Sequence, residues 1–394
     1  MKKKVSLETK IGGISLSSCI YNASGPRTGT SSALRKIALE STGCGAVLAK
    51  SATIKSTVGN PHPRTWHNGQ DAKLASVNSE GLPNSGIEYY ISSKTINETY
   101  GVFEEQTCLT KPYFVSISGH TLEDNLQMLD VIVNDGDKRI SGIELNLACP
   151  NIIGKPIIGY DFEQMSLVLD RVAQLFSTFD KDIVLGLKMP PYFDAPHYKQ
   201  AADIINAHKN IVKYVACINT VGNAFVVDSI ADMPCISSNN GFAGLSGQAI
   251  KYIALANVKK MRELLLPSID VVGVGGVFTG EDAFELILCG AAAVQVGTCH
   301  WIEGPKCFDR ICHELTDIMT NKGYTSIDQF QGKIELWNKE GASKSRLERK
   351  KLATQNNSDI TKSTISGNTF DLNAIVIAIL IVIIAALLAD KYYL

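Results

Sequence analysis

The stretch "GIELNLACPN", Gly142 to Asn151, has the pattern of a buried β-strand that ends in a polar cluster. Ile and Leu alternate through its first half, and Asn146, Cys149 and Asn151 then follow within six positions. A buried strand has little use for Asn, which needs partners for up to four hydrogen bonds. A binding site at the strand end explains the cluster. The alternative is a core cysteine beside turn-forming asparagines, because Cys is among the residue types most often buried.

Seven further segments extend the same pattern along the chain. They are residues 18–24, 45–51, 113–119, 183–189, 214–220, 270–276 and 292–298, and most are rich in Val, Ile and Leu, as strands buried on both faces are. Helical patterns lie between many of them, over residues 31–41 (with a serine cap expected), 122–133, 161–176, 249–264, 281–290 and 307–323. Eight rounds of strand and helix predict an α/β fold of the (β/α)8 or TIM barrel type. An open, doubly wound sheet is the alternative.

The predicted barrel carries its polar residues where barrels place function, at the C-terminal ends of the strands. These ends hold Lys50 and Ser51, Cys149 and Asn151, Lys188, Asn219 and Thr220, Gly275 and Gly276, and Gly297 and Thr298. The last two glycine-bearing ends, with a flexible loop expected at "GFAGLSG" (241–247), predict a phosphate-bearing ligand, because backbone N–H groups approach an anion best where no Cβ intervenes. Tight turns alone would also need such glycines. No GxGxxG motif follows an early strand, which disfavours a Rossmann dinucleotide site.

Composition limits the classes of function. The chain has 394 residues, of which 45% are hydrophobic, and a formal net charge of -1. This gives a large core and no support for nucleic-acid binding. The ten cysteines form no CxxC pair, so we expect neither a disulfide framework nor a structural metal site. We expect the protein to work in a reducing compartment. The basic N-terminus "MKKKVSLETK" lacks the apolar core of a signal peptide.

The C-terminal part differs in character from the barrel of residues 1–340. Residues 341–371 are polar, without an apolar period, and predict a flexible linker. The run "AIVIAILIVIIAALLA", Ala374 to Ala389, has no polar side chain and would span roughly 24 Å as a helix. We therefore expect a transmembrane helix over 372–391 that inserts after synthesis and leaves the barrel facing the cytosol, at a membrane the sequence does not identify. A buried core helix is the alternative.

A series of motifs gives the barrel a family resemblance. They are "LAKSAT", "SVNSEGLPNSG", "ELNLACPN", "LKMPPYFD", "CINTVGN", "GVGGVFTGEDAF", "VQVGT" and "EGP", in order over most of residues 15–335. The sequence resembles dihydroorotate dehydrogenases, FMN enzymes that oxidise dihydroorotate to orotate in pyrimidine (UMP) synthesis. "KMPPYFD" is typical of class 1A, the fumarate type. Cys149 indicates class 1, because class 2 has Ser there and adds an N-terminal helical domain that this chain does not show.

The resemblance implies a role for each residue. Cys149 would remove a proton from the substrate, FMN would take the hydride, Lys188 would stabilise negative charge on the flavin, and Lys50 would contact flavin and substrate. The substrate residues would be Lys50, Asn78, Gly81, Leu82, Asn146, Asn151, Asn219 and Thr220, with the backbone of Gly81 and Leu82 holding the carboxylate. The cofactor residues would be Ala23, Lys50, Ser51, Asn146, Lys188, Gly247, Gly275, Gly276, Gly297 and Thr298. The alternative for Lys188 is an ordinary surface lysine.

Four features depart from the class 1A pattern. Glu80 stands where Met is usual, so its carboxylate either points away from an anionic substrate or changes the substrate preference. Ala148 replaces a Ser beside the predicted base, and Thr220 replaces a Ser but keeps the hydroxyl. The fourth is the anchor, since class 1A members are typically soluble cytosolic homodimers; we expect a homodimer here too. Alternatives left open are a quinone-linked enzyme, an FMN dehydrogenase acting on another dihydropyrimidine, and a membrane-tethered flavin- or pyrimidine-binding protein.

Overall fold

The computed structural model describes residues 5–68, 71–102, 108–148, 157–180 and 183–351. The chain divides into two compact units, Met1–Ile334 and Glu335–Leu394. The first unit contains the predicted barrel, and the two units are described separately below.

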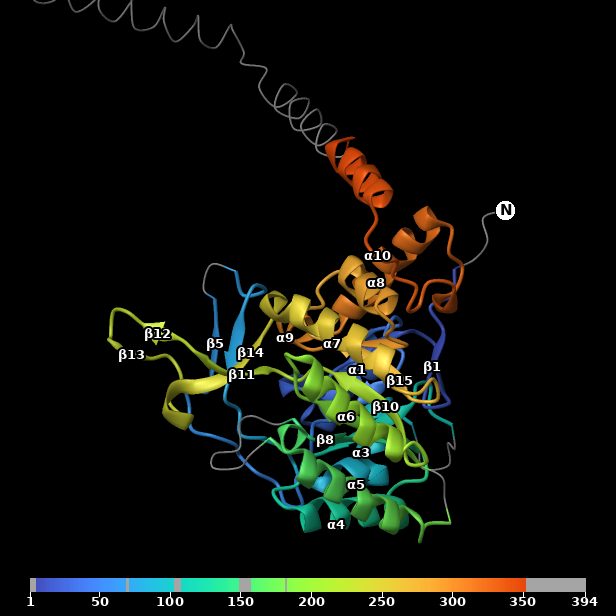
Figure 1. The fold of residues 1–394 in the computed structure, drawn as a ribbon. Coiled ribbons are helices and arrows are strands. Elements are labelled where there is room, and N and C mark those ends of the chain that lie inside the picture. The colour runs from blue at the N-terminus through green and yellow to red at the C-terminus, as the bar shows by residue number, and fades with distance from the viewer. Residues whose placement is uncertain (1–4, 69–70, 103–107, 149–156, 181–182, 352–394) are drawn as a thin grey trace, which may run out of the picture. The chain divides into compact units, whose positions relative to one another are not determined.

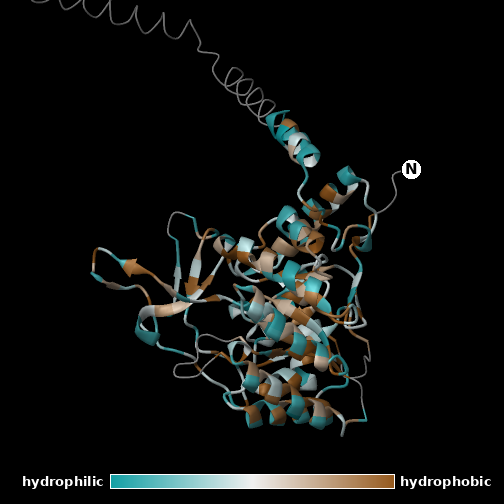
Figure 2. Cartoon of the chain, in the orientation of Figure 1, coloured by the Kyte–Doolittle hydropathy of each residue, from teal (hydrophilic) through white to brown (hydrophobic). Residues whose placement is uncertain are grey.

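The centre of the first unit is an eight-stranded parallel sheet that curls into a nearly closed barrel (Figure 1). Its strands lie in the order β3 (Ile20–Asn22), β16 (Ala293–Val296), β15 (Asp270–Val274), β10 (Val212–Cys217), β9 (Val184–Met189), β8 (Ile140–Asn146), β7 (Tyr113–Ile117) and β4 (Val47–Leu48). Each overlaps one of the eight predicted strand segments, so the barrel prediction is confirmed. In Figure 2 the helices in front of the barrel carry brown, apolar segments beside teal, hydrophilic ones.

A side chain helps to join the two ends of the sheet. The backbone N–H of Gly45 donates to the Ile20 carbonyl at 2.7 Å. The buried Asn22 Nδ2 donates to the Leu48 carbonyl at 2.7 Å, and the Leu48 N–H donates to Asn22 Oδ1 at 3.0 Å. The Asn22 carboxamide thus replaces ladder bonds between β3 and the very short β4.

Helices surround the barrel (Figure 1). They are α1 (Ser31–Glu40), α4 (Leu122–Asn134), α5 (Phe162–Phe176), α6 (Ala195–Ala207), α7 (Lys251–Leu264), α8 (Gly280–Leu288), α9 (Thr298–Glu303) and α10 (Lys306–Lys322), with α2 (Ile87–Ile91) and α3 (Ser93–Tyr100) preceding β7 in the chain. All six predicted helices are present. The cap of α1 is a correction, because Thr30, and no serine, accepts the Ala33 N–H. The C-terminal glycine of α10, Gly323, has φ +80° as a left-handed cap requires.

A second, antiparallel sheet stands beside the barrel, with the order β11 (Val221–Phe225), β14 (Phe242–Ser246), β6 (Ser76–Asn78) and β5 (Thr65–His67). The flexible loop expected at 241–247 is therefore wrong, because most of it is strand β14. The pairing of Gly244 with Asn78 brings two distant segments together at the barrel rim. Two hairpins complete the unit: β1 (Thr9–Ile11) with β2 (Ile14–Leu16), and β12 (Val227–Asp228) with β13 (Met233–Pro234).

In the second unit, residues 339–351 form a helix, although the sequence predicted an unstructured linker from 341. Within the part of the chain that the structure describes, no helix is long and apolar enough to cross a membrane. The predicted span 372–391 lies outside the described residues.

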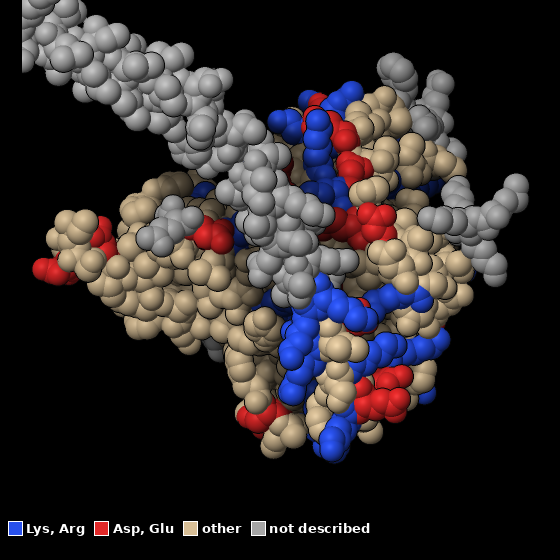
Figure 3. All heavy atoms as spheres, turned by 90° about the horizontal axis from the view of Figure 1, so that it is seen from above, with Lys and Arg blue, Asp and Glu red and all other residues tan. Residues whose placement is uncertain are grey.

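The face of the molecule in Figure 3 carries basic and acidic side chains close to one another.

Candidate active site

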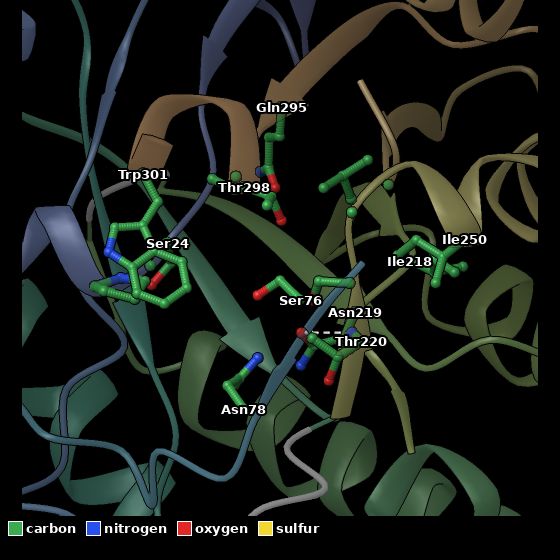
Figure 4. Close-up of a pocket in the computed structure, with 18 of the residues that line it drawn as sticks. Ser24, Ser76, Asn78, Ile218, Asn219, Thr220, Ile250, Gln295, Thr298 and Trp301 are labelled. Atoms are coloured by element: carbon green, nitrogen blue, oxygen red, sulfur yellow. Dashed lines mark hydrogen bonds between the residues drawn. The ribbon is translucent and has the colours of Figure 1, made fainter. Parts of the chain in front are cut away.

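A cavity opens at the C-terminal ends of the barrel strands and encloses about 1100 Å³, counting the part open to solvent (Figure 4). Fourteen of the predicted site residues line it: Ala23, Lys50, Ser51, Asn78, Leu82, Asn146, Lys188, Asn219, Thr220, Gly247, Gly275, Gly276, Gly297 and Thr298. Its size suits a small organic ligand or cofactor. The predicted base Cys149 and the predicted substrate residue Asn151 lie outside the described residues.

Lys188 reaches the cavity from the buried end of β9. The residue is 7% exposed, so it is no ordinary surface lysine. Its Nζ donates to Gln295 Oε1 on β16 at 2.9 Å. Burial lowers the pKa of Lys188, and the nearby Glu144 carboxylate partly offsets this. Such a buried cation is well placed to act on charge that appears in the cavity, because the surrounding dielectric is low.

Two predicted carboxamides hold the strand end that leads to Cys149. Asn219 Nδ2 donates to the Ala148 carbonyl at 2.8 Å, and its Oδ1 accepts the Thr220 N–H at 3.0 Å. Asn146 Oδ1 accepts the Ala148 N–H at 3.0 Å. Backbone groups therefore fix these two amides, and each amide has more donor and acceptor positions than these bonds use.

Thr220 offers a hydrogen-bonding group to the cavity. Its Oγ1 is buried, and among the described residues it has no hydrogen-bond partner. A buried hydroxyl without a partner is costly, so a ligand that supplies one gains affinity. The hydroxyl kept by this Ser-to-Thr departure thus points to ligand binding.

The segment expected to hold a carboxylate has a special backbone. Gly81 and Leu82 both have positive φ, +68° and +56°. For Leu this conformation is strained, and such strain is often found at functional sites. The buried Asn84 holds it, since its Nδ2 donates to the Leu82 carbonyl at 2.8 Å. Leu82 lines the cavity but Gly81 does not, and a Cβ at Gly81 would collide with Asn60.

Gly275, Gly276 and Gly297 line the cavity as well. At Gly275 and Gly276, with φ +132° and +73°, an added Cβ would collide with helix α7 or its neighbours. At Gly297 an added Cβ would meet only Ala23, at 3.8 Å, and would stand in the space a ligand could use. Thr298 follows as the first residue of α9. Gly275 and Gly276 thus let the strand end pack closely against α7, whereas Gly297 leaves its backbone open to a ligand, as phosphate sites of barrels do.

Glu80 lines the cavity but does not present an unpaired carboxylate. Its Oε2 lies 3.0 Å from Arg64 Nε, and both side chains are largely buried, at 13% and 16% exposure. Arg64 Nη1 also donates to the Val58 carbonyl at 2.6 Å. The charge of Glu80 is therefore matched locally by Arg64, while its effect on substrate preference stays a prediction.

The structure adds cavity residues that the sequence did not suggest. They include Ser24, Ser76, Ile218, Ile250, Gln295 and Trp301 (Figure 4). Gln295 gave a signal that was available, since it is a polar residue inside the apolar strand of "VQVGT". Trp301 gave none, because its ring reaches the cavity from the short helix α9, where it packs against His67 with ring centroids 4.2 Å apart. Within the described ranges, no group of three metal-ligating side chains occurs.

Comparison with known proteins gives the same family over the same region. Residues 6–319 match the family model described as dihydroorotate dehydrogenase. A Streptococcus agalactiae protein named "Putative dihydroorotate dehydrogenase A (fumarate)" is 41% identical over 330 residues, covering 84% of this chain and 99% of that protein. A Streptococcus pneumoniae protein, "Probable dihydroorotate dehydrogenase A (fumarate)", is 40% identical, covering 84% and 98%. The ligand-free crystal structure of an Eimeria tenella DHODH shares the fold, with a TM-score of 0.68 at 18% identity and coverage of 84% and 92%. The chain therefore belongs to the dihydroorotate dehydrogenase family.

Proposed function

We propose that this protein oxidises dihydroorotate to orotate, the redox step of pyrimidine biosynthesis, with FMN as its cofactor and fumarate as the electron acceptor. The observation that carries the proposal is the cavity itself. It places two buried lysines, four polar side chains of the predicted substrate site and a glycine wall together, in a chain of this family.

The cavity fits FMN, on which this family depends. The open space at Gly297, the glycines 275 and 276 and the hydroxyl of Thr298 suit a phosphate. Lys188 at the inner wall suits a ring that becomes negatively charged. When bound, FMN supplies a two-electron acceptor for the hydride of the substrate. Ala23, Lys50, Ser51 and Gly247 would complete its site.

The chain's own residues would bind the substrate and move its proton. Asn78, Asn146 and Asn219 would recognise the planar pyrimidine through paired donors and acceptors, which rejects ligands that leave them unpaired. Thr220 would give its hydroxyl to the same ligand. Cys149 would remove the proton, a task that needs the thiolate to be favoured by positive charge or hydrogen-bond donors.

Fumarate is the acceptor supported by the names of the streptococcal relatives. As a small dicarboxylate, it could occupy the orotate site and use the same backbone segment at Leu82. A quinone is the second candidate, because the predicted anchor would bring the enzyme near lipid-dissolved quinones. Steady-state turnover with saturating fumarate against a short-chain quinone separates the two, and we expect fumarate to be faster.

The test of the function uses the purified full chain. The protein should be yellow, bind orotate with a change in its flavin spectrum, and convert dihydroorotate in the presence of fumarate. A yellow protein that does not bind orotate but oxidises another dihydropyrimidine would favour an FMN dehydrogenase acting on that compound. A yellow protein without any turnover would favour the non-catalytic binding protein.

The homodimer is part of the proposal. Apolar side chains stand exposed on the small sheet and its hairpin: Phe225, Val227, Ile230, Met233 and Phe242, of which Ile230 is 96% exposed. Contiguous exposed apolar side chains favour an interface. Analytical sedimentation should give a mass twice that of one chain. Ile230→Lys should shift the measured mass toward that of a single chain.

Membrane attachment is likewise proposed from the sequence. The 16 apolar residues from Ala374 to Ala389 are long enough to enter a bilayer, with the barrel on the cytosolic side. The full chain should resist carbonate extraction from membranes, and a chain ending at residue 351 should not. A full chain released by carbonate would contradict the anchor.

A further inference from the structure

A buried chain of polar side chains crosses the barrel beneath the cavity. Lys188 Nζ donates to Gln295 Oε1 at 2.9 Å, and Gln295 Nε2 donates to Glu144 Oε2 at 2.6 Å. The three residues come from β9, β16 and β8 and are at most 7% exposed. Lys188 and Gln295 line the cavity, whereas Glu144 lies two residues before Asn146 and does not. The neutral amide therefore stands between a buried cation and a buried anion.

The amide of Gln295 has one workable orientation. Its oxygen accepts from the ammonium, and its Nε2 also donates to Tyr21 Oη at 3.1 Å. In the flipped orientation the NH2 group would face the ammonium, and the oxygen would face the Glu144 carboxylate. Donor would then meet donor and acceptor would meet acceptor, so both ends of the chain fix the amide.

The neighbouring strands make room for this arrangement. Tyr214 on β10 donates its hydroxyl to Glu144 Oε2 at 3.5 Å. Its ring fills the space where a Cβ would stand at Gly186, two residues before Lys188. The groups that face the ammonium or the carboxylate are thus Glu144, Gln295, Cys217, Tyr21 and Tyr214.

Burial disfavours the charged forms of both Glu144 and Lys188. Burial raises the pKa of Glu144, against the opposing effects of Lys188 and Gln295. Burial also lowers the pKa of Lys188, against the attraction of Glu144 and Cys217. Two buried charges of opposite sign gain most by direct contact. Direct contact would draw the ammonium down, away from the cavity.

We propose that Gln295 is a positioning residue that holds the Lys188 ammonium at the cavity wall and prevents its direct pairing with Glu144. The positive charge then acts on the ring of the cofactor in the cavity and favours its uptake of electrons. This inference rests on the proposed FMN site. It assigns to Gln295 an action through Lys188, not a contact with the reacting atoms.

The test is the midpoint potential of the bound flavin, titrated with dithionite against a reference dye, so that no turnover is needed. Gln295→Met keeps the length of the side chain and removes the amide. The Lys188 ammonium then turns toward Glu144 or loses its proton. In either case the positive charge beside the flavin ring is lost. We expect a negative shift worth at least a tenfold change in the oxidised-to-reduced ratio, about 30 mV for a two-electron couple.

A double-mutant cycle separates positioning from a merely structural role. Lys188→Met should lower the potential, and adding Gln295→Met to it should lower it no further. Gln164→Met, at an exposed position on α5, is the matched control and should change nothing. Gln295→Asn, which shortens the side chain by one methylene, should act in the same direction if Gln295→Met loses its flavin.

Two results overturn the inference. One is an unchanged potential in both Gln295 variants that bind FMN. The other is an equal, additive shift in the Lys188→Met background, which would mean that Gln295 does not act through the lysine. Both leave the proposed function standing, whereas a full chain that binds no FMN overturns function and inference together.

Discussion

Asn219 Nδ2 donates to the carbonyl oxygen of Ala148 at 2.8 Å. This bond ties the end of the sixth barrel strand to the residue just before Cys149. The same carboxamide accepts the Thr220 N–H, so Asn219 connects Ala148 with Thr220, whose hydroxyl has no partner among the described residues. We expect the reaction to depend on this residue for geometry as well as for ligand contact.

Replacing Asn219 with Ala should slow flavin reduction by dihydroorotate roughly 30- to 1000-fold. The Ala148 carbonyl loses its partner and the pyrimidine loses a contact, which together cost about 2–4 kcal/mol. Anaerobic stopped-flow absorbance measures the rate. Asn134→Ala, at an exposed carboxamide on α4, is the control. A rate within threefold of wild type in Asn219→Ala would contradict the role.

Replacing Thr220 with Val should weaken orotate binding about tenfold, because the shape stays and the hydroxyl goes. Thr220→Ser should restore most of the affinity, since serine keeps the hydroxyl. Titration of the flavin spectrum with orotate measures both. Equal affinity for the Val and wild-type proteins would show that the buried hydroxyl does not meet the ligand.

Replacing Glu80 with Gln should tighten the binding of orotate and lower the KM for fumarate, by about tenfold at low salt. Arg64 would keep its charge without its partner at 3.0 Å, and both ligands are anions. The gain should shrink as salt rises. Glu88→Gln, at an exposed position on α2, controls for loss of one surface carboxylate. Weaker orotate binding in Glu80→Gln would mean that the carboxylate itself assists the ligand.

The sequence predicted the parts of the fold that repeat and missed the parts that do not. Eight apolar segments with helices between many of them predict a barrel, because the alternation repeats along the chain. Strands β6 and β14 were missed, since they belong to a separate sheet in which they pair with each other across more than 160 positions. The expected loop at 241–247 was wrong for that reason.

The candidate site divides in the same way. Lys188, Asn219 and Thr220 were predictable because strand ends in a barrel share one rim. Glu144 was passed over, although it precedes Asn146 by two positions and therefore faces the same interior. Trp301 and Arg64 could not be predicted, because their places depend on how α9 and the small sheet fold over the rim.

Replacing Asn22 with Ala should lower the free energy of unfolding by about 2–4 kcal/mol. The buried carboxamide makes two bonds to the Leu48 backbone between β3 and β4, and its loss leaves a carbonyl and an N–H without partners. Urea unfolding followed by fluorescence measures the change. Asn210→Ala, at an exposed position, should cost little. A cost below about 0.5 kcal/mol would show that the barrel closes without this side chain.

The most direct test of the central claim mixes the purified full chain with dihydroorotate in the absence of oxygen and follows the flavin absorbance. The flavin of the wild-type protein should lose its yellow absorbance after mixing, and one orotate should form per flavin. Cys149→Ala and Lys188→Ala should keep FMN and bleach at least a hundredfold more slowly. A wild-type flavin that stays oxidised with dihydroorotate, yet bleaches with dithionite, would contradict the proposed function.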